Sequence, residues 1–201
     1  MALEPGFHDV PPGHLATVVT DLEMTAPPAR GATVALPDGI DLARVLRPDV
    51  VWYRELFSRV GGQDWLWVSR LKMPQPDLAA ILGDENVEVY VLRQGDLAVA
   101  LLELDFRESG ACEIAFFGVA PDLTGTTAGR FLMSHAIDTA FARDGMARLH
   151  LHTCTMDHPR ALAFYRRSGF TPWRQRVEVL PDPRLTGDLP TDAGPHMPLF
   201  A

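Results

Sequence analysis

The sequence predicts an α+β domain in which helices flank a mixed, mostly antiparallel central sheet. Residues 87–92 and 97–105 are two apolar runs joined by a short turn with Gly95 at its centre, a pattern typical of a β-hairpin. The run 113–119 is short and apolar, and apolar residues at helical spacing follow it, which indicates a strand that leads into a helix. An antiparallel meander followed by helices and further strands is typical of this class.

The N-terminal part contains one clear strand and two helical segments. Residues 14–24 have alternating β-branched positions and predict the first strand. Residues 31–46 predict only loose extended or turn structure. Residues 49–60 have the spacing of an amphipathic helix that ends at two glycines, and residues 77–82 predict a second, short helix. The run 65–71 between these helices has no clean period.

The second half alternates helices and strands. The strand 113–119 stops at Pro121, which has no N–H to donate to a ladder. Residues 147–153 and 170–180 predict two further strands with a helix between them. The last stretch, 181–201, contains five prolines and predicts no regular structure, so that it either lies against the body through its apolar end or frays. The buried side of the helix after residue 127 is predicted to carry Phe131, Leu132, Ala136, Ala140 and Phe141.

The composition excludes several classes of partner. Lys and Arg number 18 against 26 Asp and Glu, and a net charge of −8 argues against nucleic acid or an anionic membrane as the partner. No apolar run is long enough to span a bilayer, and the start lacks a basic signal sequence. Cys112 and Cys154 make no disulfide framework. We therefore expect one cytoplasmic domain over residues 1–201, as a monomer or a homodimer.

The turn between the strand 113–119 and the following helix predicts an anion site. A strand that enters a helix through a turn of small residues directs free N–H groups and the positive helix end at one place, and phosphate is the usual ligand there. A Walker loop would need a Lys before Ser or Thr, and this turn has no Lys. A dinucleotide fingerprint would need three glycines, whereas this turn has only Gly125 and Gly129.

The same turn resembles motif A of the GNAT acetyltransferase superfamily, which binds the pyrophosphate of acetyl-CoA. The motif has the pattern Val-x-Pro-x-x-[Arg/Gln]-x-x-Gly-x-[Gly/Ala]. Thr124 occupies the position where Arg or Gln is usual, and Thr127 occupies the position where Gly is usual. The residues in register with it are Val119, Pro121, Gly125 and Gly129.

A second block resembles the later motif of the superfamily, Asn-x-x-Ala-x-x-Phe/Leu-Tyr-x-x-x-Gly-Phe. His158 stands in place of the Asn. The two motifs have the order and spacing of the superfamily, and the resemblance covers about residues 85–180. It implies a GNAT-like α+β fold and acetyl-CoA or coenzyme A as the cofactor. The residues that match the later motif are Ala161, Phe164, Tyr165, Gly169 and Phe170.

The resemblance also implies which residues hold the cofactor. The backbone N–H of Val119 would hold the thioester carbonyl, and Thr127 would bring a Cβ to the point where the backbone normally approaches phosphate. His158 either stands beside the cofactor in place of the Asn or caps a helix together with Asp157. The expected cofactor contacts are Phe117, Gly118, Val119, Thr124, Gly125, Thr126, Thr127, Ala128, Gly129, Arg130, His158, Ala161 and Phe164.

Glu113 and Tyr165 are the candidate catalytic residues. Residues 113–119 resemble the strand of histone-type members that begins with the catalytic Glu, which implies that Glu113 takes a proton from the acceptor amine. A carboxylate among apolar neighbours is expected to have a raised pKa, and the alternative is a solvated Glu at a strand start. The resemblance implies that Tyr165 protonates the leaving thiolate, and the alternative is a core aromatic residue.

Two further groups of residues remain. His150, His152 and Cys154 share one face of a strand, but positions two apart on a straight strand are roughly 6.5 Å apart, so we expect no metal site. An early aromatic group is either core or part of the cleft for a cationic acceptor, which is a small-molecule amine or a protein amine. Its members are Trp52, Tyr53, Trp65, Trp67 and Arg70.

Two functions follow from these patterns. In the first, the protein is an N-acetyltransferase that moves an acetyl group directly from acetyl-CoA to an amine in a ternary complex. In the second, the two threonines in motif A mark a non-catalytic module that binds or senses acyl-CoA. The presence of Glu113 and Tyr165 favours the enzyme, and Thr124 and Thr127 favour the module.

Overall fold

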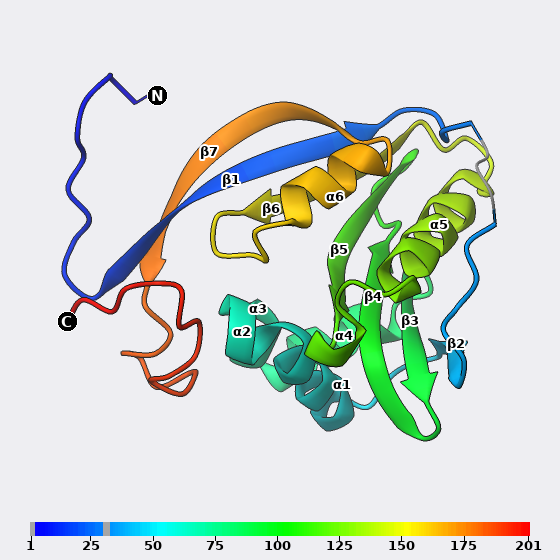
Figure 1. Cartoon of the computed structure of the whole chain (residues 1–201), viewed down its shortest axis with the longest axis horizontal. Coiled ribbons are helices and arrows are strands. Elements are labelled where there is room, and N and C mark those ends of the chain that lie inside the picture. Colours follow the sequence, from blue (N-terminus) through cyan, green and yellow to red (C-terminus); the bar gives the residue numbers. More distant parts are fainter. Residues whose placement is uncertain (1–2, 30–32) are drawn as a thin grey trace.

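The computed structural model describes residues 3–29 and 33–201, which form one seven-stranded sheet with helices on both faces (Figure 1). The strands lie in the order β2-β3-β4-β5-β6-β1-β7. Each neighbouring pair is antiparallel except β5 and β6, which are parallel. The strands are β1 (His14–Met24), β2 (Ile40–Val45), β3 (Val87–Gln94), β4 (Leu97–Asp105), β5 (Ala111–Val119), β6 (Arg148–Cys154) and β7 (Thr171–Pro181).

The helices divide between the two faces, which confirms the predicted α+β class. Side chains of α5 and α6 share a core with one face of the sheet, and side chains of α1 and α4 share a core with the other. No helix in the described part of the chain is long and apolar enough to cross a bilayer. The helices are α1 (Val50–Phe57), the π-helical turn η1 (Ser58–Gly62), α2 (Gln63–Trp65), α3 (Ser69–Lys72), α4 (Gln75–Gly83), the 3₁₀ turn η2 (Pro121–Leu123), α5 (Ala128–Phe141) and α6 (Ala161–Arg167).

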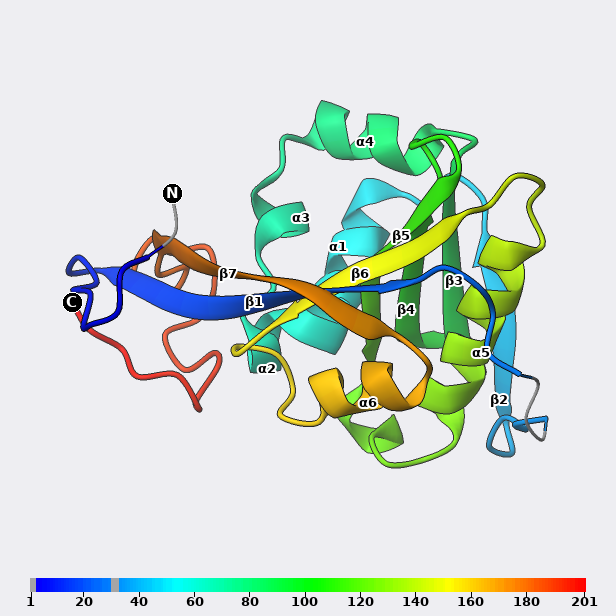
Figure 2. The same cartoon turned by 90° about the horizontal axis from the view of Figure 1, so that it is seen from above.

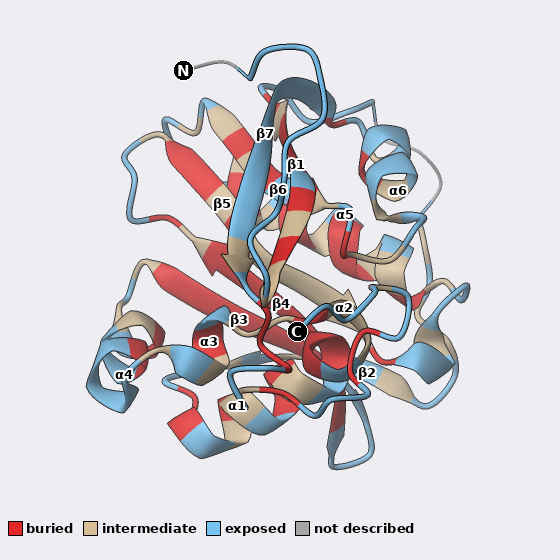
Figure 3. Cartoon of the chain, turned by 90° about the vertical axis from the view of Figure 1, so that its left-hand side faces the viewer, coloured by how far each residue is buried: buried red, intermediate tan, exposed pale blue. Residues whose placement is uncertain are grey.

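The first strand of the chain lies between the last two strands of the sheet. β1 is antiparallel to β6 on one side and to β7 on the other. The two long strands β1 and β7 run side by side and extend beyond the helices (Figure 2). β7 is an edge strand, and it is exposed along almost its whole length (Figure 3). The N-terminal segment therefore completes the sheet on the side of the C-terminal motifs.

Two segments differ from the sequence prediction. Residues 40–45 form a strand, β2, that pairs with β3, although the sequence predicted loose structure for 31–46. Residues 31 and 32 of that range lie outside the described residues. The helix predicted for 49–60 is α-helical to Phe57 and then continues as the π-helical turn η1. Gly61 in this turn leaves room for Trp67, because a Cβ there would lie 2.1 Å from the Trp67 ring.

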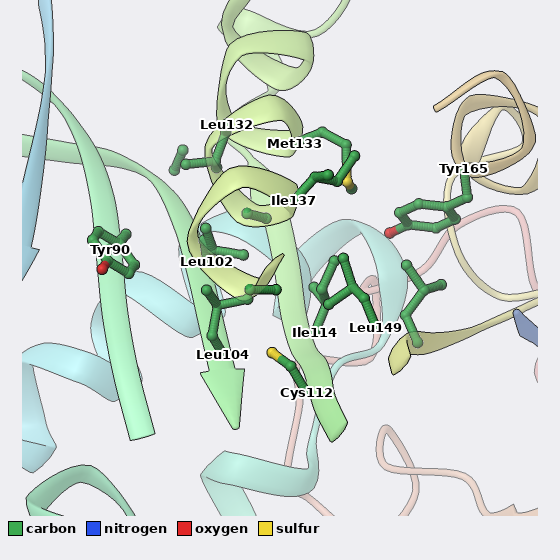
Figure 4. Close-up of a cluster of buried hydrophobic side chains, with 14 of the residues drawn as sticks. Tyr90, Leu102, Leu104, Cys112, Ile114, Leu132, Met133, Ile137, Leu149 and Tyr165 are labelled. Carbon is green, nitrogen blue, oxygen red and sulfur yellow. The ribbon is translucent and has the colours of Figure 1, made fainter. Parts of the chain in front are cut away.

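The core that contains α5 is the larger of the two. Apolar side chains of α5 interleave with side chains of β4, β5 and β6, and the ring of Tyr165 reaches this cluster from α6 (Figure 4). Alternation along the strands explains the division into two cores, because successive side chains point to opposite faces. Leu102 and Leu104 face α5, whereas Leu101 faces α1.

The C-terminal stretch lies against the body of the protein, so the frayed alternative is wrong. The described residues 182–201 contain no helix or strand, as predicted. Arg184 is buried, pairs with Asp182 at 2.7 Å and donates to the carbonyl of Met197 at 2.9 Å. The N–H of Gly194 donates to the carbonyl of Gln63 at 2.8 Å. The buried guanidinium of Arg184 thus holds in place a segment that forms no helix or strand.

A buried ionic group joins the helices α1 and α3 to the sheet. Glu103 on β4 is completely buried and accepts hydrogen bonds from the hydroxyl of Tyr53 and, at 2.5 Å, from Nη2 of Arg70. Burial raises the pKa of Tyr53, so this hydroxyl stays protonated and donates. Because water cannot reach Glu103, each of its partners is needed to offset the cost of removing the carboxylate from solvent.

Replacing Arg70 by Met is expected to lower the free energy of unfolding by about 3 kcal/mol, because it leaves Glu103 buried with its charge unpaired. Chemical denaturation measures this loss. Arg93→Met is the matched control, since Arg93 pairs with Asp41 in an exposed position, and it should cost less than about 1 kcal/mol. Equal losses in the two variants would contradict a structural role for the buried pair.

Candidate active site

The central feature of the site is the place where β5 and β6 separate. In the described chain the two strands pair at three positions, the last of which joins Glu113 to His150. Beyond it β5 continues to Val119 and β6 to Cys154 without pairing with each other. A β-bulge bends β5 here: Glu103 and Leu104 of β4 pair with Phe116 and Ile114, which leaves one residue of β5 between them unpaired. The divergence leaves backbone groups of β5 without a neighbouring strand.

The helix α6 lines one side of the opening. Phe117 of β5 stacks on Phe164 at 5.6 Å between ring centroids and meets the edge of Tyr165 at 6.2 Å. The Tyr165 ring is buried, and its hydroxyl has no hydrogen-bond partner among the described residues. Burial, and then the charge of Asp157, raise the pKa of Tyr165, so that the hydroxyl keeps its proton. Tyr165 is therefore both a packed ring and a free proton donor.

The amino end of α5 lies where β5 ends. Gly125 in the turn before it has φ +85°, and a Cβ at Gly125 or at Gly129 would meet nothing within 4 Å. Oγ1 of Thr126 donates to the carbonyl of Leu123 at 2.7 Å and accepts from the N–H of Ala128 at 3.2 Å. The turn is thus held by its own threonine and leaves open space beside the backbone.

This helix end can take an anion. The N–H groups of Gly129 and Arg130 have no acceptor in the described part of the chain, as expected for the first turn of a helix. Thr127 is the N-cap residue, and its side chain makes no capping hydrogen bond. Thr124 and Arg130 are exposed beside it. Open space, free N–H groups and the positive end of a 14-residue helix together fit a phosphate group.

Trp67 forms the wall on the opposite face of the sheet. Its ring lies 5.4 Å from Phe116 and so close to Gly118 that a Cβ there would be 3.0 Å from the ring. Its Nε1–H donates to Asp157 at 3.1 Å, and Asp157 also accepts from the hydroxyl of Thr153 at 2.7 Å. The hydrogen bonds join the segment between α2 and α3 to the loop after β6, across the opening.

Glu113 lies beside His152. Oε1 of Glu113 lies 3.7 Å from Nδ1 of His152, and both side chains are partly exposed. The interaction with His152 lowers the pKa of Glu113, so the expected raised pKa is wrong. The same interaction raises the pKa of His152. The sequence prediction missed this pair because it considered His152 only as a possible metal ligand, although the parallel register brings its strand beside Glu113.

The five residues expected to line an acceptor cleft belong mainly to the core around α1, in which Trp52, Tyr53 and Trp67 pack together. Tyr53 is fully buried and Arg70 nearly so, around Glu103, and Trp52 packs on the α1 core. Trp65 contacts His158 at 5.0 Å. Trp67 contacts Phe116 and Gly118 of β5, as the wall described above, and the guanidinium of Arg70 lies 4.9 Å from the centre of the Phe116 ring.

The segment that enters α6 is held by local hydrogen bonds. Nδ1 of His158 accepts from the N–H of Arg160 at 3.0 Å, which is a turn contact before the helix. Asp157 does not cap the helix, since its carboxylate binds back to β6 and to Trp67. Ala161 begins α6 and, like Phe164, is partly buried against the α5 core. Among the described residues, no three His, Cys, Asp or Glu side chains are arranged to hold a metal ion.

Comparison with known proteins identifies the family. The sequence model of the Acetyltransferase (GNAT) family matches residues 52–170. A comparison with curated proteins found no match. The fold resembles that of a functionally unknown conserved protein from Staphylococcus epidermidis, with a TM-score of 0.60 and 14% identity over 85% of this chain and 63% of that one.

Two further structures are similar. A GCN5-related N-acetyltransferase from Kribbella flavida has a TM-score of 0.54 and 20% identity over 87% of this chain and 63% of that one. An aminoglycoside acetyltransferase from an uncultured soil metagenomic sample, in complex with trehalose, has a TM-score of 0.55 and 18% identity over 70% of this chain and 94% of that one. At these identities the structures share the fold, and this chain spans 63% of the length of the first two. By the match of the family over residues 52–170, the chain belongs to the GNAT acetyltransferase family.

Proposed function

We propose that this protein is an N-acetyltransferase that moves an acetyl group from acetyl-CoA directly to an amine, with both substrates bound together. The observation that carries the proposal is the opening between β5 and β6, which has the ring of Tyr165 packed on Phe117 along one side and the amino end of α5 at its mouth. Acetyl-CoA supplies an activated thioester carbonyl. The protein binds both ends of acetyl-CoA and supplies the groups that accept one proton and donate another.

The cofactor would be held by backbone groups. The turn 124–127 and the first N–H groups of α5 would bind the pyrophosphate, where charge and open space favour it. The N–H of Val119 belongs to the part of β5 that has no partner strand in β6. The N–H of Ala120 donates to Val99 of β4, and successive N–H groups of a strand point to opposite sides, so that of Val119 faces the opening. It would donate to the thioester carbonyl, where negative charge builds up as the amine attacks. Arg130 adds a positive charge near the phosphate.

Two protons must move during the transfer. The amine nitrogen forms a bond to the carbonyl carbon as the carbon–sulfur bond breaks. The amine proton would go to His152, which Glu113 orients and whose pKa it raises, so that the imidazole becomes a stronger base. The hydroxyl of Tyr165 would give its proton to the leaving sulfur, because burial keeps this hydroxyl neutral. Solvent then restores both groups.

Thr124 and Thr127 support a second candidate function, a module that binds acyl-CoA without catalysis. Thr127 adds a branched side chain to the N-cap position and uses it for no hydrogen bond there. Such bulk reduces the approach of backbone N–H groups to phosphate. The module and the enzyme both bind coenzyme A, and they differ in whether free thiol is released when an amine is added.

Tyr165→Phe is expected to lower kcat on the order of 10²-fold, because it removes the proton donor while keeping the ring. Release of free thiol from acetyl-CoA with a panel of amines measures kcat, and calorimetric titration should give an unchanged Kd for coenzyme A. Tyr90→Phe is the matched control: its hydroxyl binds Glu88 on β3, and the rate should be kept. An unchanged rate in Tyr165→Phe would restrict Tyr165 to packing, and binding without turnover by the wild type would favour the module.

Glu113→Gln is expected to lower the pKa of His152. The carboxylate favours the charged imidazolium, so the folded-state pKa of His152 is raised above 6.5 and falls when the charge is removed. The pH titration of the His152 ring proton by NMR measures this, and the acid limb of kcat/KM should move to lower pH with it. Glu108→Gln, near His150 instead, is the control and should leave the midpoint in place. A midpoint that does not respond to Glu113→Gln would refute the pair.

A further inference from the structure

A small polar pocket lies on the sheet beside Glu113 and His152. Its volume is about 210 Å³. Glu113 and Phe116 pair with Asp105 and Glu103, which are two residues apart on β4, so Glu113 faces the same side of the sheet as Phe116. That side carries Trp67 and is opposite α5. The pocket therefore opens on the face where an acceptor would approach. It is lined by Asp21, Glu113, Arg148, His150, Leu151, His152, Trp173, Arg174 and Arg176.

One end of this pocket is positively charged and fixed in place. Asp21 of β1 is nearly buried and pairs with two arginines of β7: Nε of Arg174 lies 3.0 Å from Oδ2, and Nη2 of Arg176 lies 2.5 Å from Oδ1. Two guanidinium groups share a single carboxylate, which leaves a surplus positive charge in a chain whose net charge is −8. Such clamping lowers the entropy cost of binding a further anion.

Several donors of this end remain free. Both terminal nitrogens of Arg174, and Nη1 of Arg176, have no hydrogen-bond partner among the described residues. The centre of the Trp173 ring lies 5.4 Å from the guanidinium of Arg174 and 4.9 Å from that of Arg148, at cation–π distance from both. Paired N–H groups of guanidinium match the geometry of a carboxylate.

The other end of the pocket has the opposite character. Glu113 carries a negative charge beside His152 and attracts a protonated amine. The extra proton of this amine leaves to solvent before the neutral amine attacks, so that His152 is free to take the second proton during the transfer. A ligand that satisfies both ends has a cationic amine and an anionic group within the length of a small molecule.

We propose that the acceptor is a small amine that carries a carboxylate, of the size and charge of a free amino acid. Its carboxylate binds Arg174 and Arg176, and its amine lies at His152. This assignment rests on the proposed function and names its substrate class. It differs from the cationic acceptor that the aromatic residues of the sequence suggested, because Tyr53 and Arg70 are buried around Glu103 and Trp52 packs on the α1 core.

The test compares free amino acids with the corresponding α-carboxamides as acceptors, by thiol release from acetyl-CoA. Free acids are expected to have kcat/KM at least about tenfold higher, because each amide loses a charge-assisted hydrogen bond. In Arg176→Gln and Arg174→Gln this acid-to-amide ratio should fall toward one, through a higher KM for the acids. The ratio does not depend on the fraction of folded protein. Arg93→Gln, on the exposed surface of β3, is the control and should keep the ratio.

The outcomes separate the two proposals. The substrate class would be wrong if carboxamides, or amines that carry no carboxylate, were turned over as fast as free amino acids. The assignment as an acetyltransferase would then remain in place. A ratio that both β7 variants keep would also overturn it. Binding of coenzyme A without thiol release from any amine would overturn the proposed function itself.

Discussion

The separation of β5 from β6 after Glu113 and His150 is the constraint on which the rest of the site depends. Parallel strands that stay paired would bury their backbone groups in a ladder and leave no room between them. Here the bulge in β5, opposite Glu103 and Leu104, turns the strand away while both strands remain anchored at their amino ends. The opening is therefore a fixed property of the sheet and needs no moving part.

The elements next to β5 and β6 surround the opening that this separation creates. α6 covers one side with Phe164 and Tyr165, and α5 begins where β5 ends. On the other face Trp67 spans the opening and binds Asp157. The buried group around Glu103 keeps α1 and α3, and with them the Trp67 segment, on the sheet. Core and site thus share the strands β4 and β5.

The sequence predicted well what depends on local pattern. Motif residues such as Pro121 and Gly125 act within a single turn, so their spacing indicates a strand, a turn and a helix start. The helix that carries Tyr165 was predicted in the same way, and the structure adds that the Tyr165 ring packs on Phe117. The fold class followed because alternation and helical spacing are properties of short windows.

Contacts between distant segments could not be predicted. Trp67 and Asp157 are 90 residues apart, and the ionic group of Glu103 joins three elements, so neither leaves a local signal. The prediction of a raised pKa for Glu113 was wrong for the same reason, because the contact with His152 arises from the register of β5 and β6. Strand β2 was missed because its pairing with β3, and not its own pattern, defines it.

The most direct test of the central claim is an NMR titration of the ¹⁵N-labelled protein with coenzyme A, following each backbone amide. If the opening between β5 and β6 holds the cofactor, the largest shift changes will fall on Gly118 and Val119 and on residues 125–130 at the start of α5. Changes confined to β7, or no change at saturating ligand, would contradict the account.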